Sequence, residues 1–357
     1  MFERKEEFKT FLRKIGSGEH TSRGLSREES AEALKIILQG QATPAQIGAF
    51  MIAHRIRRPE AQELAGMIDA YSELGPKLTS KEKQTRPICF GMPFDGRNRT
   101  VPIYPLTTLV LLSAKQPVVL QGGKRMPIKF GLTTAELFEV LGLQLTGLSI
   151  QELQTCFDEN GLALIHQPDH FPLADSLIDY REELGKRPPL ASMELIWTAH
   201  KGEHLLVSGF VHPPTEARAY KALALIGEKD LISIKGLEGG IDLPISRACI
   251  TGRITHNQFK RTILHANDHD CSGQDIEWSN LDEWRKLAIQ ALENKGPFQT
   301  AVHWNAGVYL WLAGQAKSLE AGLNKADIIM RKGLAKQTLE ELISWRKKIN
   351  VLRKAEK

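Results

Sequence analysis

Short apolar runs alternate with helical patterns through the middle of this chain, and this alternation constrains the fold more than any other feature. Each run has the composition of a strand that is buried on both faces. The helical patterns between the runs suit the crossover connections that join parallel strands. The apolar runs are residues 87–90, 118–120, 163–165, 205–207 and 231–234. We therefore expect an α/β fold with a mostly parallel central sheet flanked by helices, and a binding site at the carboxyl ends of the strands.

The first part of the chain reads as a small all-helical domain. Ser26 and Glu29 have the spacing of a capping box, which predicts a helix that ends near Gly40. A proline in the first turn predicts two more helices, one from Thr43 and one from Pro59. We therefore divide the chain into a helical domain (1–76), a linker (77–85) and an α/β domain (86–357), with the segment near 168–190 as a candidate to pack with the helical domain.

Composition favours a cytoplasmic protein with no membrane partner. The chain has 357 residues, which is enough for a large buried core. No apolar run approaches the ~20 residues that span a bilayer, and residues 1–5 hold no apolar signal core. The four cysteines are widely separated, so we expect reduced thiols rather than a disulfide framework or a zinc pair.

The basic excess of the chain lies at its C-terminal end. The formal net charge is +5, and residues 325–357 hold ten lysines and arginines against four acidic residues. The pattern predicts a basic helix over 339–352, with Trp345 beside Arg346. Such a helix can bind phosphates, although a solvated helix is the more common explanation of such a run.

The segment Gly91 to Thr100 follows the first predicted strand, where an open α/β sheet presents its ligand. A loop that cradles a diphosphate needs small residues with free φ and free N–H donors. Pro93 removes a donor, and Phe94 fills the space that phosphate oxygens would take. Two arginines follow these residues, and they suit an anionic ligand or an exposed surface.

Several segments resemble the anthranilate phosphoribosyltransferase family (glycosyltransferase family 3, nucleoside phosphorylase-like fold). Residues 25–29, 40–50 and 63–66, together with Arg55, resemble its helical opening. Residues 181–187 resemble its Arg-x-x-Leu-Gly-x-Arg segment, and 235–239 resemble its His-Gly-x-Asp/Glu-Gly turn. The resemblance implies a site between the two domains, where phosphoribosyl pyrophosphate and Mg²⁺ meet an aromatic amine. It also implies a homodimer through the N-terminal helices.

The chain departs from the family pattern in the loop that binds diphosphate. The family sequence is Gly-Thr-Gly-Gly-Asp-Gly, and only Gly91, Asp95 and Gly96 match it here. Asp95 could contact a ribose or a phosphate, or simply form an Asx-turn with Gly96. The resemblance therefore implies a remodelled phosphoribosyl pyrophosphate site.

Two further departures concern the acceptor and the metal. The family segment Lys-His-Gly-Asn-Arg is Gln-Gly-Gly-Lys-Arg at 121–125, so Gly123 and Arg125 are retained and Lys124 replaces the asparagine. The family's adjacent Asp-Glu pair is missing, and Glu238 and Asp242 are the weak equivalents for Mg²⁺. Arg181 corresponds to the acceptor side, although it could equally pair with a neighbouring glutamate.

These departures resemble a divergent branch of the family whose members keep the fold, lack the glycine loop and bind nucleic acid. We therefore expect loss of standard anthranilate transfer and nucleic-acid binding through a basic inter-domain groove. The alternatives are an active phosphoribosyltransferase that uses Mg²⁺ with anthranilate or another acceptor, and a scaffold that only dimerises. No catalytic residue is assigned. The residues expected to bind phosphate or nucleic acid are Gly91, Asp95, Gly96, Arg97, Arg99, Thr100, Gly123, Lys124, Arg125 and Lys129.

Overall fold

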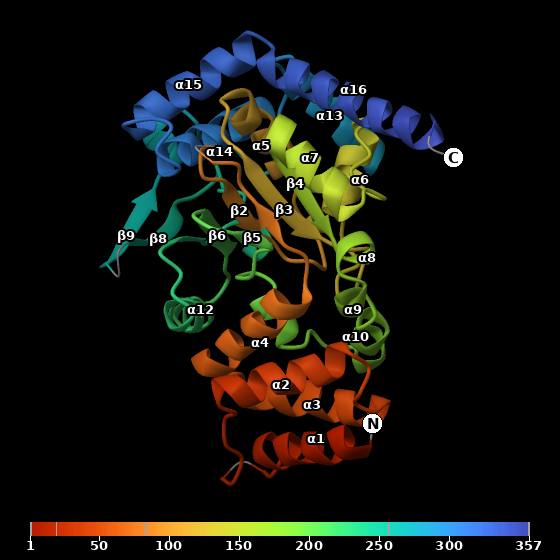
Figure 1. Ribbon diagram of the computed structural model, residues 1–357. Coiled ribbons are helices and arrows are strands. Elements are labelled where there is room, and N and C mark those ends of the chain that lie inside the picture. Colours follow the sequence, from red (N-terminus) through yellow and green to blue (C-terminus); the bar gives the residue numbers. More distant parts are fainter. Residues whose placement is uncertain (1, 19, 83, 256–257, 356–357) are drawn as a thin grey trace.

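A computed structural model describes residues 2–18, 20–82, 84–255 and 258–355. The chain forms a helical unit at one end and a sheet flanked by helices at the other (Figure 1). The helices of the helical unit are α1 (Phe2–Ile15), α2 (Arg27–Leu38), α3 (Pro44–Arg57) and α4 (Ala61–Leu74).

The predicted helix starts are present. The Glu29 backbone N–H donates to the Ser26 hydroxyl at 3.1 Å, and the Glu29 carboxylate accepts from the Ser26 N–H at 3.0 Å. This reciprocal pair is the capping box that the sequence predicts at the start of α2. Helix α3 begins at Pro44 as expected, and α4 begins at Ala61, just beyond Pro59.

The central sheet has seven strands in the order β4-β3-β2-β6-β7-β8-β9. The five predicted apolar runs form its five parallel strands, whose residues are all buried. The last two strands form an antiparallel hairpin that the sequence analysis did not identify. The strands are β2 (Ile88–Gly91), β3 (Val118–Gly122), β4 (Leu162–His166), β6 (Leu205–Gly209), β7 (Asp230–Ile234), β8 (Cys249–Thr255) and β9 (Gln258–Leu264). A separate parallel pair joins β1 (Leu78–Thr79) to β5 (His200–Lys201).

Helices cover both faces of this sheet, and each face has its own apolar core. Alternate residues of a strand point to opposite faces, so Phe90 packs in one core and Cys89 in the other. The second core also contains the apolar faces of α1 to α4, so the helical unit is packed onto the α/β part. The helices of that part are α5 (Tyr104–Ser113), α6 (Thr134–Val140), α7 (Ile150–Asn160), α8 (Gln167–His170), α9 (Pro172–Asp175), α10 (Ile178–Leu184), α11 (Leu190–Met193), α12 (Pro213–Leu225), α13 (Leu281–Leu292), α14 (Gln299–Leu312), α15 (Leu319–Arg331) and α16 (Leu334–Ala355).

The segment that joins β4 to β5 lies against the helical unit. Helix α10 contacts α3, and α11 contacts α4. The Arg55 guanidinium of α3 donates to the Arg187 carbonyl, which follows α10. Residues of the α/β part therefore line the boundary between the two units.

The basic C-terminal helix is α16, which lies at the end of the molecule opposite the helical unit (Figure 1). The Arg346 side chain is buried and donates to the carbonyls of Gln144 and Thr146 at 2.8 and 3.1 Å. Lys347 and Lys348 are exposed. Part of the basic run therefore anchors the helix, and the rest faces solvent.

The expected reduced thiols are present. All four cysteines are free thiols in buried positions. None of the helices in the described part of the chain combines the length and the apolar character needed to cross a membrane.

Glu63 of α4 holds the helical unit together. Its carboxylate accepts from the backbone N–H of Leu25 at 3.0 Å and of Glu60 at 2.7 Å, and it lies 3.1 Å from the His54 Nε2. The Arg57 guanidinium donates to the same carboxylate. Burial alone would raise the pKa of Glu63, but the His54 contact and the two N–H groups lower it from 4.5 to about 2.

We expect Glu63→Gln to lower the free energy of unfolding by about 3–5 kcal/mol at neutral pH, because the variant removes the buried carboxylate that pairs with Arg57 and accepts two backbone N–H groups. The folded-state pKa of Glu63 lies below its unfolded value. Its stabilisation is therefore complete above about pH 4.5 and is lost as the pH falls towards 2. Urea unfolding of the full chain should show that the difference in free energy of unfolding between wild type and variant becomes smaller as the pH falls from about 4.5 towards 2.

The matched control is Glu7→Gln, which breaks an exposed ion pair with Arg4 on α1. Exposed pairs contribute about 1 kcal/mol or less, so this variant should unfold almost like the wild type. Equal losses in the two variants, or a Glu63→Gln effect that does not change with pH, would contradict the role given to Glu63.

Candidate functional site

The loop after β2 is folded back on itself and fills the space beside the strand ends. Gly91 passes so close to the segment after α11 that a Cβ on Gly91 would lie 1.9 Å from the Leu195 carbonyl oxygen. Gly96 has φ +74°, a conformation that favours glycine. Close packing therefore requires glycine at position 91, and the backbone conformation favours glycine at position 96, whether or not the loop binds a ligand.

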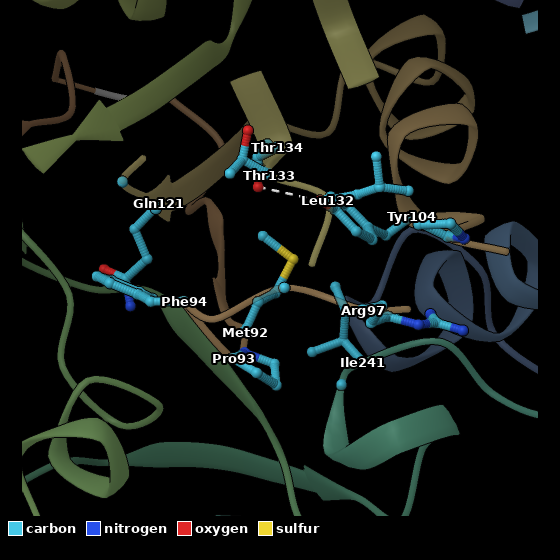
Figure 2. A pocket seen from close by; sticks show the side chains of 15 residues that line it. Met92, Pro93, Phe94, Arg97, Tyr104, Gln121, Leu132, Thr133, Thr134 and Ile241 are labelled. Atoms are coloured by element: carbon cyan, nitrogen blue, oxygen red, sulfur yellow. Dashed lines mark hydrogen bonds between the residues drawn. The ribbon is translucent and has the colours of Figure 1, made fainter. Parts of the chain in front are cut away.

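Apolar side chains take up most of the space where this loop faces the sheet. Figure 2 shows the buried side chains of Met92, Phe94 and Ile241 around a small pocket. The cavity volume of this pocket is about 20 Å³. That is close to the minimum for a single water and far below the ~300 Å³ of a typical small-molecule site.

A buried guanidinium lies between the two carboxylates that could bind a metal. Arg97 forms an ion pair with Asp242, and its Nε lies 3.7 Å from the Glu238 Oε1. Its guanidinium also donates to the Thr100 hydroxyl and, at 3.1 Å, to the Val101 carbonyl. Only 5% of the Arg97 side chain is exposed, so this cation is part of the interior.

The carboxylates are also held by the loop backbone. Glu238 accepts from the N–H groups of Arg99 at 3.0 Å and Thr100 at 2.9 Å. Burial alone would raise the pKa of Glu238, but these N–H groups, with Lys129 and Arg97, lower it. Burial raises the pKa of Asp242, and the Arg97 guanidinium opposes that rise.

This set of donors does not fit Mg²⁺. The cation coordinates carboxylate oxygens and several waters in octahedral geometry, usually together with substrate phosphates. Here the oxygens of Asp242 and Glu238 face Arg97 and the loop N–H groups, and the adjoining pocket has room for about one water. The two predicted metal ligands do lie together, but the Arg97 guanidinium takes the position of a cation between them.

A larger groove runs along the boundary between the helical unit and the carboxyl ends of the strands. It consists of two adjoining hollows, with cavity volumes of about 410 and 720 Å³, that share Arg187, Ser192, His212 and Thr215. Six lysines and arginines line the hollows, against two carboxylates. The cations are Arg55, Arg58, Arg99, Lys129, Arg187 and Arg218, and the carboxylates are Asp95 and Glu238.

The positive charge of this inter-domain groove is poorly balanced. Asp95 is paired with Arg187, and Glu238 is held by the loop N–H groups. Within the described residues, Arg58 and Arg218 form no ion pair. Burial and the nearby Arg58 lower the pKa of Arg218, which shows that like charges face each other here.

The structure separates the predicted phosphate-binding residues into three groups. Arg99 and Lys129 line the inter-domain groove together with Asp95. Lys124 and Arg125 are exposed and form ion pairs with Asp175 at 3.0 Å and Glu136 at 2.7 Å. The remaining members, Gly91, Gly96, Arg97, Thr100 and Gly123, belong to the loop and to the small pocket wall.

Arg181, expected on the acceptor side, is buried in an ion pair with Glu194. The guanidinium donates to Glu194 at 3.0 Å, and the Tyr71 hydroxyl donates to the same carboxylate at 3.2 Å. Gln167 adds a donor at 3.3 Å. A direct ligand contact by Arg181 would require this network to open.

Four groove residues were missed as site residues in the sequence analysis: Arg55, Arg58, Arg187 and Arg218. They come from α3, from its C-terminal cap, from the end of the α10 segment and from α12. Arg55 and Arg187 belong to segments that resemble the family, which was the available signal. Arg58 and Arg218 had none, because only the packing of α12 against α4 brings α12 near the end of α3.

Comparison with known proteins agrees with the fold and the two-part organisation. The model of the glycosyl transferase family helical bundle domain matches residues 9–75, and the model of the α/β domain matches residues 95–336. The chain belongs to this family. An anthranilate phosphoribosyltransferase from Polaromonas sp. is 23% identical over 326 residues, which cover 90% of this chain and 92% of that protein. A protein of Aquifex aeolicus described as uncharacterized is 27% identical over 308 residues, or 85% and 92% of the two chains.

Solved structures of the family share the whole architecture. Anthranilate phosphoribosyltransferase from Thermus thermophilus has a TM-score of 0.76 at 21% identity and covers 94% of this chain and 98% of its own. The Saccharomyces cerevisiae enzyme in complex with phosphoribosyl pyrophosphate and Mg has a TM-score of 0.79 at 15% identity, with 95% and 98% covered. At such identities the likeness shows the fold, and the chemistry depends on the residues of this chain.

We expect Arg97→Ala to lower the free energy of unfolding by about 3–5 kcal/mol, because it leaves the buried Asp242 carboxylate without its cation. Thermal and urea unfolding of the full chain measure the loss. The matched control is Arg99→Ala, which removes an exposed arginine from the same loop and should change stability by less than about 0.5 kcal/mol. Similar effects of the two variants would contradict the different roles given to these arginines.

Proposed function

We propose that this family member binds nucleic acid through the inter-domain groove and does not carry out standard anthranilate transfer. The observation that carries the proposal is the charge of the groove, where six cations face two carboxylates that already have partners. Arg187 and Lys129 pair with these carboxylates, and the other four cations form no ion pair within the described residues. A surplus of four positive charges along one groove suits a polymer with regularly spaced phosphates.

The shape of the groove supports the same ligand class. Its two hollows adjoin, so a ligand can extend from the Arg99 side to the Arg58 side. Each hollow has a volume typical of a binding site, in contrast to the small pocket behind the loop. Phosphate contacts depend on charge rather than on base sequence, so DNA and RNA are both suitable ligands.

The loop and the metal residues argue against the alternative of an active phosphoribosyltransferase. The related S. cerevisiae structure holds phosphoribosyl pyrophosphate and Mg. In this chain Phe94 and Met92 fill the space beside the loop, and Arg97 neutralises the carboxylates. A diphosphate–metal complex would need free space beside the loop and free carboxylate oxygens, and these two changes reduce both. The homodimer implied by the family resemblance stays a prediction.

The test measures binding of a labelled single strand and a labelled duplex, by fluorescence anisotropy over a range of salt. The logarithm of the binding constant should fall linearly with the logarithm of salt concentration. We expect the double variant Arg58→Gln/Arg218→Gln to weaken binding and to reduce the magnitude of this slope by about 2, or about 1 per lost phosphate contact. Glutamine keeps most of the side-chain length and removes the charge.

The matched control is Lys347→Gln/Lys348→Gln on α16, which removes two exposed charges at the opposite end of the molecule. This variant should keep the wild-type slope. An unchanged slope in the groove variant would contradict the proposed site. A reduced slope in the α16 variant alone would show that the C-terminal helix binds the nucleic acid instead.

A further inference from the structure

Three potential metal ligands converge beside the central strands β2 and β6. Cys89 lies on β2, His200 on β5, and His204 in the turn before β6. One ligand atom from each residue lies within 4.8 Å of the others. The cluster is away from the carboxyl strand ends, because His204 and the nearby Glu228 precede the strands β6 and β7.

The two imidazoles are oriented by contacts on their outer nitrogens. The His200 Nε2 lies 2.8 Å from the Ser80 hydroxyl, and the His204 Nε2 lies 3.1 Å from the Glu228 carboxylate. The two Nδ1 atoms face each other at 3.5 Å. Metal-binding histidines are typically held in this way, with a hydroxyl or carboxylate on the nitrogen that does not bind the metal.

The inner nitrogens of the two histidines mark the place where a cation would fit. The His204 Nδ1 also lies 2.9 Å from the Gly202 carbonyl. A metal ion between the Nδ1 atoms would bind both imidazoles through lone pairs, and Cys89 would release its thiol proton to solvent on binding the ion.

We propose that Cys89, His200 and His204 bind one Zn²⁺ ion, with Ser80 and Glu228 holding the outer nitrogens of the histidines. Thiolate and imidazole are ligands that Zn²⁺ prefers, whereas Mg²⁺ and Ca²⁺ prefer oxygen. Tetrahedral Zn–N bonds of about 2.0–2.1 Å place two nitrogens about 3.4 Å apart, close to the separation of the Nδ1 atoms. Sulfur and nitrogen ligands of the same ion lie about 3.6 Å apart, so the thiol has to approach by at most about 1.2 Å, the difference between 4.8 and 3.6 Å.

An open cleft leads to the cluster, and a bound ion would link two strands. His204 and Glu228 line an open cleft with a cavity volume of about 520 Å³, through which an ion can enter. Three protein ligands leave a fourth position for water. The bound ion would join β2 to β5, and β5 pairs with β1, which lies within the linker from the helical unit. It would therefore stabilise the connection between the two units.

The competing interpretation is a hydrogen-bonded row from Ser80 through both histidines to Glu228, without a metal. The test first equilibrates the chelator-treated full chain with ZnCl₂, removes excess metal and measures bound zinc by elemental analysis. We expect one equivalent. A second sample loaded with Co²⁺ should show a tetrahedral d–d spectrum and a thiolate-to-cobalt charge-transfer band, which only Cys89 can supply within this cluster.

Variants then locate the site. His204→Ala should lose stoichiometric zinc and the cobalt spectrum, and Glu228→Gln should weaken zinc binding about 10–100-fold while keeping the thiolate band. The control His265→Ala removes an exposed histidine outside the cluster and should retain one equivalent. Circular dichroism checks that each variant is folded. Less than stoichiometric zinc in the wild type, a cobalt spectrum without the thiolate band, or equal zinc in His204→Ala and wild type would overturn the proposal.

Discussion

The buried ion pair between Arg97 and Asp242 is the interaction on which the rest of the site depends. It connects the loop after β2 to the turn after β7, and the same Asp242 carboxylate accepts from the Ile103 N–H at 2.9 Å just before α5. A buried carboxylate needs such partners, because burial alone is costly. The guanidinium supplies from within the chain a positive charge that a bound metal could otherwise provide.

The chain has the family fold, and we propose that its ligand-binding surface differs from that of the family. The loop fills the space next to the sheet with Phe94 and Met92, and the exposed positive charge lies farther out, along the inter-domain groove. Arg187 takes part in both features, since it pairs with Asp95 of the loop and lines both hollows. The pocket behind the loop is nearly filled, and the hollows of the basic groove are far larger.

Much of the fold could be predicted from sequence, because its signals are local. The parallel strands are continuous apolar runs, and the start of α2 has both halves of its capping box within four residues. The β8–β9 hairpin was missed because most of its residues are partly or fully exposed, so they form no apolar run. For the site, sequence could not separate Arg97 from Arg99, since the burial of Arg97 depends on Asp242, far along the chain. The same limit applies to Lys124, whose partner Asp175 lies on another helix.

The most direct test of the central claim is calorimetric titration of the full chain with phosphoribosyl pyrophosphate and Mg²⁺ at moderate salt. Binding of a nucleic acid by the same sample serves as the control that the protein is folded and able to bind a ligand. If the loop and Arg97 close the ancestral site, the titration should show no saturable binding that depends on Mg²⁺. Saturable binding of one equivalent, lost when Mg²⁺ is removed, would contradict the account and restore a phosphoribosyltransferase as the leading interpretation.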